Sequence, residues 1–476
     1  TLMRSSAASD VYKRQIQPAK REKIENEMKG EAFYHALKIM DSVCTGCTHC
    51  MHLCPTSAIR IKNGKASLNE AACTDCGMCL KTCPQQAIIV EQDDFSQIFK
   101  FSYRIILLPT VLIGQFPEDI SEEQIFSELH NMGFHYVMEV DKATEILSEE
   151  TRKYMEKNSH LRPFISNSCP AVIRLIQVRF PSLIDHIIRL KQVMDIAAIY
   201  VRKKFIDKGI PAEEIGVFFV TQCAAKIAAI KCPVGEEKSS VDGVINMDFI
   251  YNKILLAINK NKDKPIDKVP EQYHLTPESI RWTLTDGEAS HYAGRCLAID
   301  EIHNVIEILE KLENDEITDI DFLELRACDH SCAGGALTIN NRFLTIERLQ
   351  KRMENYVKNH YHTVNKMPQY RDFLNEQIRL TGKILPRSIE KLDENMLIAM
   401  EKMEKINRIM KVLPQIDCGA CGTPSCRTLA QDVVQGKAKL NQCVFMQKIL
   451  TKEGLITPEE SMELSAKIWG AEKFNK

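Results

Sequence analysis

The sequence has almost no net charge and no long apolar run, and these two deficits exclude several classes of function. Its 62 basic and 64 acidic side chains leave a formal net charge of −2, so there is no broad positive field for nucleic acid or an anionic membrane. The longest apolar runs, such as residues 105–113, fall far short of the roughly 20 residues that span a bilayer. Residues 1–15 lack the apolar core of a secretory signal. We therefore expect a soluble, cytoplasmic protein that binds neither nucleic acid nor membrane.

Cysteine, in contrast, is abundant. The chain has 18 cysteines in 476 residues, and most of them fall in groups separated by two to four residues. Such spacing suits metal ligands better than disulfides, and free thiols need a reducing compartment. The length predicts two or more domains. Residues 1–30 are expected to be disordered or artefactual, because the run at residues 5–15 resembles translated adapter sequence.

The first cysteine pattern is an internal repeat. Residues 44–54 read Cys-x2-Cys-x2-Cys-x3-Cys, the pattern recurs at residues 73–83, and each run is followed by proline. The repeat resembles bacterial two-cluster ferredoxins, in which the fourth cysteine of each run ligates the other cluster. The resemblance implies a small α+β domain over residues 31–98 with two [4Fe-4S] clusters, zinc being the alternative metal. The implied ligands are Cys44, Cys47, Cys50 and Cys83 for one cluster, and Cys73, Cys76, Cys79 and Cys54 for the other.

Short apolar segments alternate with helical segments between residues 99 and 343, which predicts an α/β core with parallel or mixed sheets. Three predicted strands, at residues 163–165, 215–220 and 322–327, are each followed by a cysteine. Pro170 can open the helix after the first of these cysteines. Since ligands bind at the carboxyl ends of strands in open α/β sheets, four cysteines could converge there. They are Cys169, Cys223, Cys328 and Cys332.

Three motifs around these cysteines resemble the [FeFe]-hydrogenase large subunits. They are Ser-Asn-Ser-Cys-Pro at 166–170, Gln-Cys-Ala-Ala-Lys at 222–226, and Ala-Cys-Asp-His-Ser-Cys at 327–332. The resemblance implies a hydrogenase-like domain over residues 99–375. Its four cysteines would hold a [4Fe-4S] cubane, with Cys332 bridging to a diiron unit that carries CO, cyanide and a dithiolate. Lys226 matches the lysine that interacts with a cyanide of that unit.

The sequence departs from this family at the positions that handle protons. Ser168 stands where rapid hydrogenases have a proton-relaying cysteine, and a hydroxyl is far less acidic than a thiol of pKa about 8.5. Thr221 and Arg326 replace methionines of the family pocket. We therefore expect Ser168 and Lys226 to serve a slow hydrogen-reactive site. Gln192 is interpreted as a helix-surface residue, the alternative being a match to a glutamine of the family pocket. The two remaining cysteines, Cys232 and Cys296, are interpreted as buried structural thiols.

The C-terminal third carries a heptad pattern and a last cysteine group. Apolar residues at 389–410, within a linker over 376–413, predict either an amphipathic helix packed on its own domain or a short coiled coil that forms a homodimer. Cys418, Cys421, Cys426 and Cys443 resemble a small helical [4Fe-4S] domain over residues 414–447, zinc again being the alternative. Residues 448–476 are expected to form a helical tail.

This order of domains resembles a subgroup of sensory hydrogenases. The resemblance implies an oxidoreductase that interconverts H2 with protons and electrons, slowly or as a hydrogen sensor, and exchanges electrons with a ferredoxin-like partner. A signalling partner would then supply the output. The alternative is a non-catalytic electron-transfer or redox-regulatory protein that lacks the diiron unit, and an iron-sulfur assembly factor is a third hypothesis.

Overall fold

The structure is a computed structural model that describes residues 34–261, 276–358, 367–387, 392 and 395–474. The segment predicted to be artefactual, residues 1–30, lies outside the described residues. Apart from Tyr34, all described residues belong to one compact unit, His35–Lys476. Among the described helices, none combines the length and the apolarity that crossing a bilayer requires.

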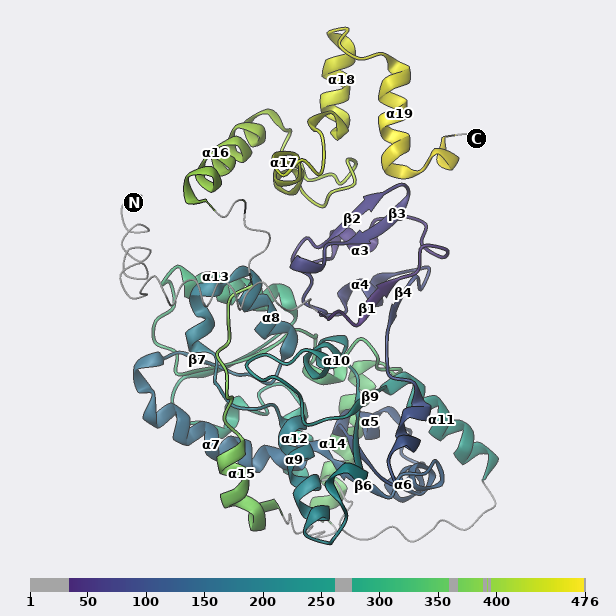
Figure 1. Cartoon of the computed structure of the whole chain (residues 1–476), viewed down its shortest axis with the longest axis vertical. Coiled ribbons are helices and arrows are strands. Elements are labelled where there is room, and N and C mark those ends of the chain that lie inside the picture. The colour runs from purple at the N-terminus through teal and green to yellow at the C-terminus, as the bar shows by residue number, and fades with distance from the viewer. Residues whose placement is uncertain (1–33, 262–275, 359–366, 388–391, 393–394, 475–476) are drawn as a thin grey trace. The chain divides into compact units, whose positions relative to one another are not determined.

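The larger of two parallel sheets has four strands in the order β6-β5-β8-β9 (Figure 1). They are β6 (Tyr136–Glu139), β5 (Tyr103–Leu108), β8 (Ile215–Thr221) and β9 (Gly243–Asn246). Every residue of β8 is buried, as expected for a parallel strand covered on both faces. This sheet confirms the predicted α/β core.

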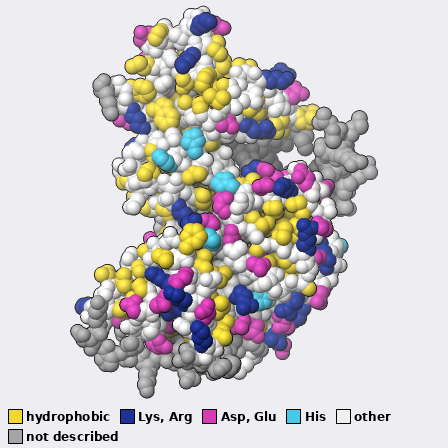
Figure 2. Space-filling view, turned by 180° about the vertical axis from the view of Figure 1, so that it is seen from behind, with side chains coloured by type: hydrophobic (Ala, Val, Ile, Leu, Met, Phe, Trp, Pro, Cys, Tyr) yellow, Lys and Arg dark blue, Asp and Glu magenta, His cyan; other side chains and the backbone are white. Residues whose placement is uncertain are grey.

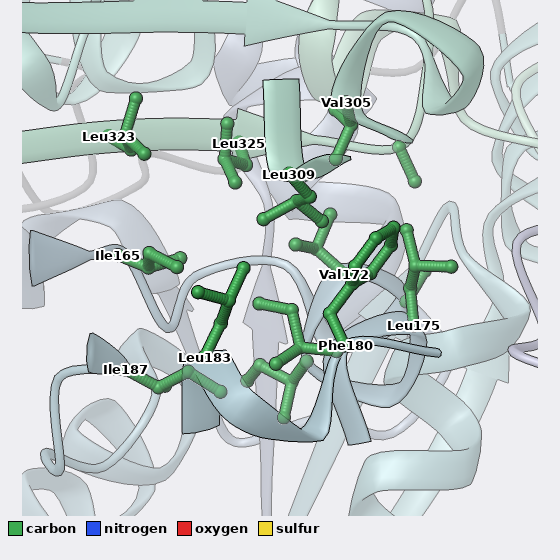
Figure 3. Packing of buried hydrophobic residues seen from close by; sticks show 14 of the residues in the cluster. Ile165, Val172, Leu175, Phe180, Leu183, Ile187, Val305, Leu309, Leu323 and Leu325 are labelled. Carbon is green, nitrogen blue, oxygen red and sulfur yellow. The ribbon is translucent and has the colours of Figure 1, made fainter. Parts of the chain in front are cut away.

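The smaller parallel sheet has the order β10-β11-β7, with β10 (Cys296–Asp300), β11 (Phe322–Arg326) and β7 (Phe164–Ile165). Against it pack α8 (Pro170–Arg179), which begins with the predicted first-turn proline, and α13 (Ile302–Glu313). Figure 3 shows the apolar side chains of these elements filling the space between them. The predicted strands that precede the three cysteine motifs are therefore all present.

The remaining helices of this core are α5 (Thr110–Gln115), α6 (Glu122–Asn131), α7 (Thr144–Lys157), α9 (Val193–Ile206), α10 (Ala224–Lys231), α11 (Met247–Lys260), α12 (Pro277–Thr283), α14 (Arg342–Lys358) and α15 (Arg371–Gln377). The chain stays against the core beyond α15. Ile384 packs into the apolar cluster of α8 and α13, and the Arg387 amide donates to the carbonyl of Gln177 at 2.8 Å.

The first cysteine repeat forms a small α+β region. Strand β1 (Leu37–Ile39) pairs antiparallel with β4 (Ile88–Val90), and β2 (Ile59–Lys62) pairs with β3 (Lys65–Leu68). The short helices α3 (His49–His52) and α4 (Met78–Thr82) each carry the third cysteine of one run. The two halves of the sequence repeat thus form corresponding elements.

The C-terminal region is helical: α16 (Met396–Val412), α17 (Cys426–Val434), α18 (Val444–Lys452) and α19 (Pro458–Trp469). Within the heptad segment, Ile406 and Met410 pack into an apolar cluster with α17, which agrees with the amphipathic-helix alternative. Leu397 and Met400 are exposed, and Figure 2 shows hydrophobic side chains gathered on this region at the top of the view. Ile389, the first heptad residue, lies outside the described residues.

Candidate metal centres

Four cysteines of the core line one cavity of about 320 Å³, between the carboxyl ends of the two parallel sheets. Cys169 follows β7, Cys223 follows β8, and Cys328 follows β11. Cys332 lies in the 3-10 turn Ser331–Gly334. The structure therefore brings together the four residues that the sequence motifs singled out.

Two of these cysteines occupy the N-cap positions of helices. Cys169 precedes α8 and Cys223 precedes α10, both with extended backbone. The free N–H groups and the positive end of the dipole at a helix N-terminus favour an anion, so both helices stabilise thiolate charge.

The loop from Cys328 to Cys332 is held in an unusual backbone conformation. His330 and Ser331 have φ values of 59° and 56°, a region that costs non-glycine residues about 1–2 kcal/mol. A Cβ atom at Gly335 would lie 2.6 Å from the carbonyl oxygen of Gln222. Glycine is required there because the loop passes against the backbone that carries Cys223.

The electrostatics of this cavity fit a cationic cluster. Burial and the neighbouring Cys169 thiol raise the pKa of the Cys223 thiol to about 12, and burial raises the pKa of Cys328 well above its usual range. Four thiolates so close together need a compensating positive charge, which bound iron supplies. The donor set therefore fits an all-thiolate [4Fe-4S] cubane.

A second cavity of about 490 Å³ adjoins the first through shared lining residues. Ser168, Gln222, Lys226, Arg326 and Cys332 contribute to both cavities. Cys332, the cysteine that is predicted to bridge the two metal units, therefore lies at the boundary between the two cavities.

Gln192 lines this second cavity, so the interpretation of Gln192 as a helix-surface residue is wrong. It is the N-cap residue of α9, and its Nε2 donates to the carbonyl of Asn167 at 3.1 Å. The side-chain oxygens of Gln192 and Gln222 are buried without a hydrogen-bond partner among the described residues. Such atoms point to an additional group in the cavity.

Lys226 is half-buried in the same cavity, and its Nζ lies 5.7 Å from the centre of the Phe219 ring. Within the described residues, no carboxylate forms an ion pair with this ammonium group. A cation in this setting can accept an anionic ligand such as cyanide.

Ser168 belongs to a buried polar network that the sequence did not reveal. Its hydroxyl donates to Oε2 of Glu288 at 2.8 Å, and the Ser166 hydroxyl donates to the same oxygen at 2.6 Å. Arg326 forms ion pairs with Glu288 at 3.2 Å and Glu324 at 3.3 Å. Burial raises the pKa of Glu288. Glu288 has no recognisable motif spacing to Ser168, because only the fold brings residues 120 positions apart into contact.

The ferredoxin-like cysteines also group as predicted. A cavity of about 340 Å³ is lined by Cys44, Cys47, Cys50 and Cys83. Burial, and then the charges of the other three thiols, raise the pKa of Cys50 to about 12. For the other set, burial and then the nearby Cys54 raise the pKa of Cys76 to about 12. Each fourth cysteine therefore faces the opposite run, and both sets fit [4Fe-4S] clusters.

In the C-terminal region, Cys426 and Cys443 are buried in the apolar cluster beneath α16 and α17. Burial raises the pKa of Cys421, with further contributions from Cys443 and Cys418. These four thiols therefore lie near one another, and Cys418 is the exposed member.

The two cysteines outside the motifs are half-buried, so their description as buried thiols is wrong. Cys232 ends α10, where its Sγ lies 3.9 Å from a guanidinium nitrogen of Arg387. Cys296 begins β10 and donates to the carbonyl of Tyr292 at 3.6 Å. Both are at element ends, which are less covered than element centres.

Comparison with known families agrees with this arrangement. Residues 109–274 match the family described as iron only hydrogenase large subunit, C-terminal domain. The central region is therefore similar to this family over about a third of the chain. Residues 43–88 match a 4Fe-4S dicluster domain, and residues 413–445 match a family of Fe-S cluster domains. The match to the hydrogenase family thus lies between matches to iron-sulfur domain families on both sides.

Among curated proteins, the chain is 21% identical over 231 residues to the NADP-reducing hydrogenase subunit HndD of Solidesulfovibrio fructosivorans, covering 46% of this chain and 36% of that relative. It is 47% identical over 38 residues to a component of the ion-translocating oxidoreductase complex of Azoarcus sp., covering 8% of this chain and 21% of that component. The chain therefore spans about a third or less of these relatives. The [FeFe]-hydrogenase HydA1 from Chlamydomonas reinhardtii, in a variant form, aligns with a TM-score of 0.45 at 15% identity, covering 63% of this chain and 97% of that one.

Proposed function

We propose that this protein is an iron-sulfur oxidoreductase of the hydrogenase type, which interconverts H2 with protons and electrons slowly or as a hydrogen sensor. The observation that carries the proposal is the pair of adjoining cavities, one lined by four cysteines and the other by Ser168, Gln192, Lys226 and Cys332. A purely structural cluster would need only the first cavity.

In this proposal, Cys169, Cys223, Cys328 and Cys332 would hold a cubane, and Cys332 would also hold a diiron unit. When bound, the diiron unit supplies a redox-active metal site for the heterolytic cleavage of H2. Lys226 and the free side-chain oxygens of the two glutamines hold and orient that unit. The ferredoxin-like and C-terminal cysteines hold three further cubanes that exchange electrons with a ferredoxin-like protein.

The buried carboxyl of Glu288 is proposed to hold the proton that Ser168 alone would transfer poorly. Its hydrogen bond to the Ser168 hydroxyl links the cavity to a group with a raised pKa. The raised pKa keeps Glu288 protonated closer to neutral pH, which suits a proton carrier. The positive charge of Arg326 offsets the electrostatic repulsion between the carboxyl groups of Glu288 and Glu324.

An infrared spectrum tests the proposal. The protein is produced anaerobically with the machinery that assembles diiron units, and CO and cyanide stretching bands are sought. Their presence is the expected result, and their loss in a Cys332→Ser variant that keeps the three other cubanes would locate the unit. A spectrum without these bands contradicts the proposal.

The second candidate is an electron-transfer or regulatory protein that holds only cubanes. Arg326 favours it, because this charged residue lines the second cavity where the related family carries a methionine. The iron content separates the candidates: four cubanes correspond to about 16 irons per chain, and a diiron unit raises the total to about 18.

A further inference from the structure

The C-terminal cysteine domain lies against the first ferredoxin run, whereas the second ferredoxin run lies against the core. We infer that the four cysteine sets form one electron path in the order C-terminal set, Cys44 set, Cys73 set and core set, and that the partner delivers electrons to the C-terminal set. Here the Cys44 set is Cys44, Cys47, Cys50 and Cys83, and the Cys73 set is Cys73, Cys76, Cys79 and Cys54. This inference rests on the proposed electron-transfer function.

The inner end of the path is where the Cys73 set meets the core. Cys76 packs against the apolar cluster that also contacts Cys169 and Cys223. Lys81, which lies between Cys79 and Cys83, donates to the carbonyl of Gly334, in the loop that carries Cys332. The second ferredoxin run therefore lies beside the core cavity.

A buried ion pair fixes this inner contact. Asp75, between Cys73 and Cys76, is fully buried and lies 2.5 Å from Nη1 of Arg174 on α8, the helix that starts after Cys169. Removing one partner of a buried ion pair strongly destabilises the contact. The relative position of these two cysteine sets is thus held by charge as well as by packing.

The outer end is where the C-terminal domain covers the first run. Backbone amides of the β2–β3 hairpin donate to this domain: Ile61 to the Gly422 carbonyl at 2.8 Å, and Gly64 to the Ile468 carbonyl at 2.9 Å. A Cβ atom at Gly422 would lie 2.5 Å from the Ile61 oxygen. Glycine next to Cys421 therefore allows the ligand loop to approach the hairpin.

Two further contacts connect this loop with the Cys44 set. A Cβ atom at Gly419 would lie 2.7 Å from Cε1 of His52, in the helix that carries Cys50. Lys473 donates to the carbonyl of Thr45 at 2.7 Å, and Trp469 donates to the carbonyl of Ala420 at 3.0 Å. The segment after α18 therefore holds the two ligand loops together, and is more than the helical tail expected from the sequence.

The exposure of the cysteines indicates at which end of the electron path the partner protein binds. Among the cysteines that the structure describes, Cys418 alone is exposed, whereas the members of the Cys44 set are buried or half-buried. A protein donor consequently meets the C-terminal set first. A one-electron carrier such as a reduced ferredoxin would give up one electron at this set and be oxidised, and each later set would be reduced and reoxidised in turn. Two such transfers supply the two electrons that two protons need to form H2.

Variants of the ion pair between Arg60 and Asp432 test this order without replacing a cysteine. This ion pair joins β2 to α17 at 2.7 Å and both side chains are largely buried. The Asp432→Arg variant should keep full iron content but weaken docking. Two charges in contact typically interact with an energy that corresponds to about a tenfold change in an equilibrium constant. We therefore expect ferredoxin to reduce the inner clusters about tenfold more slowly in this variant. The magnetic interaction between the C-terminal and neighbouring clusters in the paramagnetic resonance spectrum should decrease.

The charge swap, Arg60→Asp with Asp432→Arg, should restore both the reduction rate and the magnetic interaction. Gly422→Ala should act like Asp432→Arg, and Gly454→Ala is its matched control. Gly422 and Gly454 share a left-handed backbone, with φ of 78° and 70°, but a Cβ atom at Gly454 meets nothing within 4 Å. Wild-type reduction kinetics in Asp432→Arg, or equal slowing in Gly454→Ala, would overturn the inference.

These readouts follow iron-sulfur reduction and do not need the diiron unit. If the infrared bands are absent but Asp432→Arg slows reduction by ferredoxin, the proposed hydrogen chemistry fails and the electron path stands. If the bands are present and Asp432→Arg has no effect, the electron path fails and the hydrogen chemistry stands.

Discussion

At the residue scale, Ser168 stands where the related family has a proton-relaying cysteine, and a buried carboxyl from a distant part of the chain contacts it. Ser168 lacks the acidity of a thiol, but Glu288 lies within hydrogen-bond distance of its hydroxyl. The carboxyl is held by two serines and Arg326, and burial raises its pKa. In the proposed relay, the chemistry that a cysteine would perform alone is divided between this hydroxyl and this carboxyl.

Replacing Glu288 by glutamine should lower the rate of H2 evolution about 100-fold, the usual contribution of a positioned acid or base. Glutamine keeps the hydrogen bonds but cannot release a proton. Hydrogen evolution from a reduced electron carrier measures the effect, with infrared bands and iron content as checks on the metal centres. Glu278→Gln, an exposed carboxylate on α12, should be neutral. A wild-type rate in Glu288→Gln would exclude Glu288 from proton transfer.

The Ser168→Cys variant should increase the rate of H2 evolution if proton transfer limits turnover. A thiol of pKa about 8.5 ionises far more readily than a hydroxyl. The same assay applies, and the effect should be smaller in a Glu288→Gln background because both residues serve one relay. An unchanged rate in the single variant would show that another step limits turnover.

At the element scale, the carboxyl ends of the strands carry the core cysteines, and one strand end also buries a carboxyl group. The core cysteines stand at the carboxyl ends of β7, β8 and β11, where the sheet stops and loops begin. Glu139 ends β6, and it is buried with its carboxylate 3.5 Å from the Lys142 ammonium. Burial raises the pKa of Glu139 to about 8.

This raised pKa makes stability depend on pH in a defined direction. The folded protein holds a proton on Glu139 that the unfolded chain loses above its ordinary pKa of 4.5. The stabilisation is complete below pH 4.5 and disappears as the pH rises toward 8. Glu139→Gln cannot ionise, so it should raise the unfolding free energy by about 1–3 kcal/mol more at pH 8 than at pH 5, the equivalent of one to two pKa units.

Thermal unfolding midpoints at pH 5 and pH 8 measure this difference. Glu156→Gln on α7, an exposed position, should change neither midpoint. Equal stabilisation by Glu139→Gln at both pH values would contradict the assignment of the pH dependence to Glu139.

At the scale of the whole molecule, cysteines far apart in sequence act as sets. Cys83 lines the cavity of the first run, although it belongs to the second run. If the ligation is crossed as proposed, it joins the two halves of the repeat, because neither half would hold a complete cluster alone.

Single cysteine substitutions should therefore remove clusters according to the crossed sets. Cys83→Ser should destroy the same cluster signal as Cys44→Ser, and Cys54→Ser the same signal as Cys76→Ser, each with a loss of about four irons per chain. Iron analysis and paramagnetic resonance of the reduced protein distinguish the two signals. Cys296→Ser, outside all sets, should keep the full iron content. If Cys83→Ser instead removed the signal lost in Cys76→Ser, the ligation would not be crossed.

The sequence by itself determined the cysteine sets and the elements that carry them. Local spacing places thiols on loops and helix ends, and the alternation of apolar segments is enough to predict β7, β8 and β11. These features depend on neighbouring residues, so they can be read from one chain. The same reasoning was wrong for Gln192, whose place in the cavity depends on how α9 packs.

Only the tertiary structure decided which side chains meet across long separations. The contacts of Ser168 with Glu288, of Asp75 with Arg174, and of Arg60 with Asp432 join residues 99 to 372 positions apart. No local pattern encodes such pairs, because they arise when separately formed elements pack together. The proposed proton relay and electron path therefore depend on the fold, whereas the candidate metal ligands are already visible in the sequence.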